Sequence, residues 1–189
     1  MKKLYLLFIL FLLTAANLAG CGTIQKLHEP SADIPNEFVI SDIPFYPQSE
    51  YQCGPSALAT VLSFYGDSIS PSGISDEIFS LKLKGTLPLD MELFPRKRGF
   101  NTSSYIGSIP DIENNLLKGH PLILFLDTGI LNWKAGHYIV VTGFNKEDGY
   151  IIVRWGDEKE KRITYQNLLK KWKKTGYWTL LVTPQNGQI

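Results

Sequence analysis

The sequence of 189 residues predicts an α+β fold in which a helical half packs on an antiparallel sheet half. Patterns with helical periodicity occupy the chain up to about residue 118, and continuous apolar runs typical of buried strands follow them. With 44% hydrophobic and 20% charged residues, the composition is that of an ordinary globular domain. The length is close to that expected for one such domain.

The helical half begins after an extended segment over residues 38–44. The clearest helix is predicted over residues 54–66, with Pro55 in its first turn and Gly66 just past its end. Its apolar side chains recur at helical spacing on one face, at Leu58, Val61, Leu62 and Tyr65. Shorter helices are predicted over residues 75–81, 89–98 and 110–118.

The sheet half consists of apolar runs rich in β-branched and aromatic residues. They predict buried strands over residues 121–127, 137–144 and 150–155. Turn residues between 145 and 149 join the last two strands into an antiparallel pair. An amphipathic helix over 164–174 and a strand over 177–183 complete a domain of residues 38–184, which a tail over 185–189 follows.

Residues 1–20 predict a lipoprotein signal peptide. Lys2 and Lys3 precede an apolar run that is too short for a membrane-spanning helix and suits a secretory signal. The run ends in Leu-Ala-Gly-Cys at residues 18–21, which resembles the lipobox of bacterial lipoproteins and implies a diacylglyceryl group on Cys21. Two or more acyl chains hold a protein stably at a membrane. An ordinary signal peptide followed by a chance cysteine is the alternative.

The residues after the signal peptide bear on localisation and partners. Gly22 gives no acidic inner-membrane retention signal, so in a host with two membranes the outer one is expected. Residues 21–37 then form a polar tether. Without Lys2 and Lys3, 17 basic and 18 acidic residues remain, a balance that gives no electrostatic case for nucleic-acid binding. The basic run over residues 170–174 fits the exposed face of a helix.

Cys53 is the candidate nucleophile. The chain has two cysteines, and lipidation of Cys21 leaves Cys53 as a free thiol. Cys53 stands at the start of the helix over 54–66, where free backbone N–H groups and the helix dipole are expected to lower its pKa. Gly54 permits close backbone approach, and the Gln48 amide can stabilise an oxyanion beside the Cys53 backbone N–H. A buried, inert cysteine is the alternative.

His137 is the candidate base, because it begins a predicted strand of the sheet half, which is where a papain-like cleft would carry the base that faces the nucleophile. A histidine beside apolar strand residues is also common in protein cores. His28 in the tether and His120 in a turn are weaker candidates. Three scattered histidines without acidic or cysteine ligands at suitable spacing predict no metal site.

Two motifs together resemble the cysteine-peptidase family thirty-nine. Gln-x4-Cys-Gly-Pro at residues 48–55 opens a helix, and Gly-His-Tyr-Ile-Val-Val-Thr-Gly follows at residues 136–143. The family includes bacteriocin-processing peptidase domains, which cut leaders ending in two glycines, and stand-alone exported relatives. The resemblance implies a papain-like cysteine peptidase fold with a Cys/His/Asp triad and an oxyanion-hole glutamine. Cys53, His137 and Gln48 match these positions, and no cofactor or metal is required.

The third member of the triad is where the chain departs from the family. Relatives carry Asp-Pro at the end of the strand after the histidine strand, where this chain has Arg154 or Trp155. Asp157, two or three residues later, is the candidate that orients His137. A plain charged turn residue is the equal alternative, and Asn145 is a weaker substitute. Losing the orienting residue reduces catalysis without abolishing it.

The sequence therefore predicts an exported, lipid-anchored cysteine peptidase or related amide hydrolase that acts on a peptide or protein. The best-known relatives are fused to transporters, so a leader peptide is one substrate option among others. A non-catalytic peptide-binding module is the first alternative, motivated by the missing Asp-Pro. An acyltransferase that uses the same thioester chemistry is the second.

Overall fold

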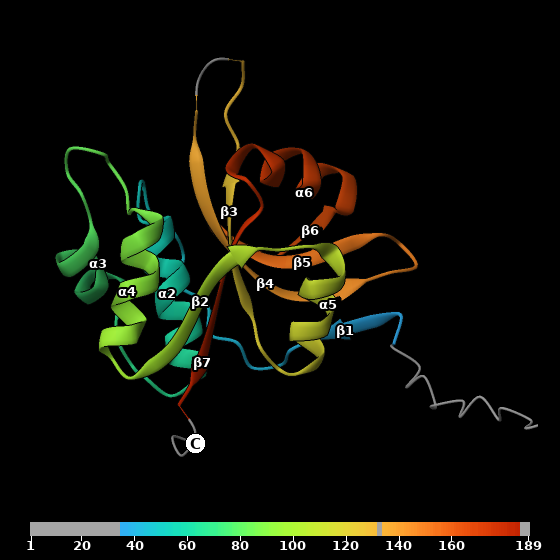
Figure 1. Cartoon of the computed structure of the whole chain (residues 1–189), viewed down its shortest axis with the longest axis horizontal. Helices are drawn as coiled ribbons and strands as arrows, with labels where there is room; N and C mark the ends of the chain where they lie inside the picture. Colours follow the sequence, from blue (N-terminus) through green and yellow to red (C-terminus); the bar gives the residue numbers. More distant parts are fainter. Residues whose placement is uncertain (1–34, 132–133, 186–189) are drawn as a thin grey trace, which may run out of the picture. The chain divides into compact units, whose positions relative to one another are not determined.

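The computed structural model describes residues 35–131 and 134–185 (Figure 1). The predicted signal peptide, Cys21, nearly all of the tether and residues 186–189 of the tail lie outside the described residues. Residues Pro35–Ile189 form one compact unit. Within the described part of the chain, no helix combines the length and apolar character needed to cross a membrane.

An antiparallel sheet of seven strands forms the centre of this unit, in the order β2-β7-β3-β4-β5-β6, with β1 also paired to β4. The strands are β1 (Glu37–Val39), β2 (Phe100–Ile106), β3 (Leu122–Asp127), β4 (Gly136–Asn145), β5 (Tyr150–Trp155), β6 (Glu158–Thr164) and β7 (Trp178–Pro184). β3 pairs with the first part of β4 and β1 with its last part. Gly143 allows β1 to approach, because a Cβ there would lie 2.8 Å from the carbonyl oxygen of Phe38.

Helices cover both faces of the sheet (Figure 1). They are α2 (Cys53–Phe64), α3 (Pro71–Ile78), α4 (Pro88–Lys97), α5 (Ile109–Leu117) and α6 (Tyr165–Trp172), which a 3-10 turn, Lys173–Thr175, extends. Leu58 of α2 and Met91 of α4 share one core with Val140. Leu116 of α5 and Leu168 of α6 share the other core with Val141. Neighbouring residues of β4 therefore supply opposite cores, as the alternation of a strand requires.

The α+β fold is confirmed, and every predicted helix and strand has a counterpart. Two strands that were not predicted, β2 and β6, were obscured by their polar sequences, Phe-Asn-Thr-Ser-Ser-Tyr-Ile and Glu-Lys-Glu-Lys-Arg-Ile-Thr. Both lie at the edges of the sheet, where one side of each strand stays in solvent and the apolar signal is weak. The helix expected over 75–81 begins earlier, at Pro71, because the Ser70 hydroxyl accepts from the Gly73 N–H and caps it.

Candidate active site

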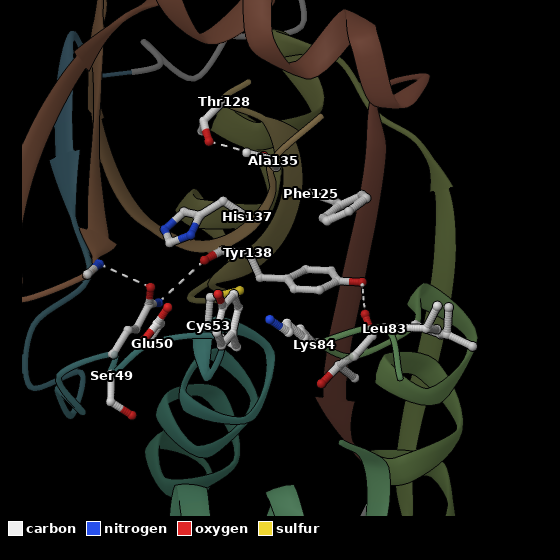
Figure 2. Close-up of a pocket in the computed structure, with 17 residues that line it drawn as sticks. Ser49, Glu50, Cys53, Leu83, Lys84, Phe125, Thr128, Ala135, His137 and Tyr138 are labelled. Carbon is white, nitrogen blue, oxygen red and sulfur yellow. Dashed lines mark hydrogen bonds between the residues drawn. The ribbon is translucent and has the colours of Figure 1, made fainter. Parts of the chain in front are cut away.

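A cleft of about 460 Å³ lies where the start of α2 meets the start of β4 (Figure 2). Cys53 is the first residue of α2, and His137 is the second residue of β4. Gln48 lies in the loop before α2, and all three side chains line the cleft. The fold thus brings together residues that are 89 positions apart in the chain, from 48 to 137.

Cys53 is half-buried, and this burial raises the pKa of its thiol above the ordinary value of 9.0. Backbone hydrogen bonds from Tyr138, Gly54 and Cys53 itself oppose this rise but do not cancel it. The expectation that the helix start lowers the pKa is therefore wrong for this site. The N–H groups at the helix start do favour the thiolate, but loss of hydration outweighs them. At neutral pH the resting group is a thiol.

His137 is also neutral in the resting site, because burial, followed by the positive charge of Lys161, lowers its pKa to about 4. Its Nε2 atom is buried and has no hydrogen-bond partner. The imidazole ring instead lies against the indole of Trp155, with 4.7 Å between ring centroids and 35° between planes. Lys161 Nζ lies 5.2 Å from the centroid of the same indole.

Gln48 is held in place by backbone groups of the sheet half, from β4 and from the β5–β6 turn. Its N–H donates to the Gly156 carbonyl at 2.8 Å, and the Gly156 N–H donates to Gln48 Oε1 at 3.1 Å. Its Nε2 donates to the Tyr138 carbonyl at 3.4 Å. A side-chain amide has two N–H donors, so one donor of Gln48 stays available for an oxyanion in the cleft.

The Peptidase_C39 like family matches residues 40–180, which include this cleft. The chain belongs to this family. No curated protein sequence matches it.

Solved structures of C39 peptidases share the fold. The peptidase domain of Streptococcus ComA is 24% identical with a TM-score of 0.60, and the match covers 76% of this chain and all (100%) of that domain. A protein described as a C39-like peptidase from Bacillus anthracis is 14% identical with a TM-score of 0.63, covering 79% and 98%. A double glycine motif protease from an AMS/PCAT transporter, solved with its leader peptide, is 18% identical with a TM-score of 0.59, covering 78% and 95%. The papain-like fold predicted from the sequence is thereby confirmed.

The family position for an orienting carboxylate is filled by other groups in this member. Asp157 is exposed in the turn between β5 and β6, and Nε2 of His137 has no partner, so Asp157 does not orient the ring through that nitrogen. Asn145 lies eight residues further along β4, roughly 26 Å away, where its Oδ1 accepts from the Asp148 N–H. Neither substitute therefore holds His137 in this structure.

Arg154 and Trp155, which stand where the Asp-Pro was expected, take different places. The Arg154 side chain is buried and donates to the carbonyl groups of Ile43 and Lys159, away from the cleft. Trp155 follows it on the strand and therefore projects to the opposite face, where it meets His137. Of the two residues, only Trp155 is in contact with the candidate base.

An aromatic wall closes the other side of the cleft and was not found from the sequence. Tyr138 stacks on Phe125, with 4.5 Å between centroids, and its hydroxyl donates to the Thr86 carbonyl at 3.2 Å. Trp178 of β7 packs edge-on against Tyr138. The only sequence signal was the position of Tyr138 directly after the candidate base, because its partners come from distant strands.

Proposed function

We propose that this chain is an exported, lipid-anchored cysteine peptidase or a closely related amide hydrolase. The observation that supports it best is the meeting of Cys53, His137 and an immobilised Gln48 in one cleft of a C39-like fold. Nucleophile, base and oxyanion donor are the minimum set for acyl transfer through a thioester. The substrate is a peptide or protein, and a leader peptide, as in the solved AMS/PCAT protease, is one option.

The proposed reaction starts from the neutral thiol of Cys53 and the neutral imidazole of His137. His137 accepts the thiol proton as Cys53 Sγ attacks the peptide carbonyl carbon. The carbonyl oxygen becomes an oxyanion, which the free N–H of Gln48 Nε2 and the Cys53 backbone N–H stabilise. The C–N bond then breaks, and the leaving amine takes the proton from His137. Water attacks the resulting thioester with His137 again as base, which releases the acid and restores the thiol.

The test uses residues 35–189, which contain the whole of both cores and only one cysteine, Cys53. This unit and its Cys53→Ala variant are incubated with a mixture of tryptic peptides, and new termini are identified by mass spectrometry. We expect cleavage by the parent and none by the variant. Equal amounts of product from both proteins would show that Cys53 is not the nucleophile.

A non-catalytic peptide-binding module is the second candidate. The neutral resting pair and the unpartnered Nε2 of His137 favour it. It predicts that peptides bind equally to the parent and to Cys53→Ala, and that the parent leaves them intact. An acyltransferase is separated by adding a primary amine: a peptide amide product, in place of the free acid, indicates transfer to the amine.

The anchor is a proposal of its own, supported by the lipobox-like residues 18–21. Cleavage before Cys21 and lipidation of its thiol would hold the domain at a membrane, the outer one in a host with two membranes. Expression of the full chain with a labelled fatty acid tests this. Label on the parent and none on Cys21→Ser is the expected result, and label on both would overturn it.

A further inference from the structure

The indole of Trp155 lies against the imidazole of His137. The indole and imidazole centroids lie 4.7 Å apart with 35° between the ring planes, a tilted contact at the short end of the distances found for aromatic pairs. Trp155 is half-buried and packs against the core of α5 and α6, so the indole has a fixed place. The ring of His137 therefore rests on a rigid surface.

We propose that Trp155 is the positioning residue of the site, holding His137 by contact between the two rings in place of the hydrogen bond from a carboxylate. This inference rests on the proposed function, since it assigns a task to Trp155 in that reaction. It differs from the family pattern, in which an aspartate would hold the ring through a nitrogen atom.

Three observations carry the inference. Nε2 of His137 is buried without a hydrogen-bond partner, so no acceptor fixes the ring through this atom. The only ring that packs on it among the described residues is Trp155. The ring contact also suits the reaction, because the imidazolium that forms when His137 takes the thiol proton is attracted to the face of an indole.

The charges around His137 favour its neutral form. Lys161 of β6, which lies over the indole, lowers the pKa of His137. Glu158 forms an ion pair with Lys161 and offsets part of its charge. Glu50 lines the same cleft from the loop before α2, and Asp157 is exposed in the β5–β6 turn. The ring contact with Trp155 requires no charge on His137. It can therefore hold the neutral imidazole, which is the form that these surroundings favour.

The test compares Trp155→Phe, which keeps an aromatic face, with Trp155→Leu, which removes it. In residues 35–189, NMR titration of the two histidines, His120 and His137, is combined with the rate of Cys53 alkylation by iodoacetamide across pH. In Trp155→Leu we expect His137 to titrate closer to the ordinary 6.5, because the smaller side chain lets water reach the ring. We also expect Cys53 to alkylate at least tenfold more slowly near neutral pH, because the released ring no longer lies where it can accept the thiol proton. Trp155→Phe should retain most of the parent behaviour.

Trp155→Phe keeps the inference testable should Trp155→Leu fold poorly. A second pair of variants tests the effect of the charge that lies over the indole. Lys161→Gln leaves the indole in place and should raise the pKa of His137 by roughly half to one unit, because a nearby positive charge is lost. Arg162→Gln is the matched control. It removes a positive charge that lies over Tyr150 on the opposite face of the strand, and it should leave the pH at which His137 titrates unchanged. Unchanged titration and alkylation in Trp155→Leu, or a full loss in Trp155→Phe, would overturn the role of Trp155. These readouts need no turnover, so they stand apart from the test of peptidase activity.

Discussion

Placing a carboxylate at residue 155 should convert the neutral pair into one that ionises more easily. Trp155→Asp introduces a negative charge on the strand next to that of His137, on the same face of the sheet. In the parent, His137 has a pKa of about 4, so about one imidazole in a thousand is protonated at pH 7. An opposite charge at this range raises such a pKa by roughly 1 to 2 units. The same carboxylate would also supply the acceptor that Nε2 lacks.

The expected shift increases the protonated fraction of His137 at pH 7 by about 10- to 100-fold. An imidazolium beside Cys53 in turn favours the thiolate, so alkylation of Cys53 should accelerate below pH 8. NMR titration of His137 and iodoacetamide kinetics measure the two effects in the unit 35–189.

Trp155→Asn is the matched control, because it loses the same indole and has the size of aspartate without its charge. Urea denaturation of both variants checks that the loss of packing is equal. If His137 titrates at the same pH in the Asp and Asn variants, residue 155 does not reach the imidazole. The electrostatic reasoning would then be wrong.

Three further predictions follow from the cleft and the sheet. Gln48→Ala should reduce hydrolysis by roughly 10²- to 10³-fold, because an oxyanion donor is lost; a change in substrate affinity alone, with kcat intact, would contradict this. Since burial raises the pKa of Cys53, its alkylation by iodoacetamide in the parent should climb steadily up to pH 9 and beyond, and a plateau near pH 6 would show a preformed thiolate instead. Gly143→Ala should destabilise the fold by about 1–3 kcal/mol in urea denaturation, because the new methyl group meets the Phe38 carbonyl oxygen at 2.8 Å. Gly149→Ala, at a turn glycine with open space around it, is a comparison that isolates backbone strain from steric overlap.

Local sequence determined the helix that presents Cys53 and the strand that presents His137. α2 follows from the spacing of its apolar residues and from the Gly66 stop, where φ is +90°. β4 follows from an apolar run that is buried on both faces. These patterns act over a few residues, so they can be recognised without knowledge of the fold. The family motif around Gln48 and Cys53 could be recognised for the same reason.

Tertiary structure decided the ionisation of the pair. The helix start alone predicts a lowered pKa for Cys53. Burial of the thiol in the assembled cleft, whose lining includes Tyr138 and Phe125 from two paired strands, raises that pKa instead. Desolvation depends on every group that packs around an atom, and those groups are scattered along the chain. The sequence therefore indicated which residue carries the thiol, and the assembled cleft determined its protonation.

Tertiary structure also decided what stands beside His137. From the sequence, Arg154 or Trp155 stood at the expected position of the third residue, and Asp157 and Asn145 were the substitutes considered. The pairing of β4 with β5 and the alternation of side chains send Arg154 to one face and Trp155 to the other, against the imidazole. A shift of one residue in that register would exchange the two, and a register is set by the whole sheet and not by any one strand.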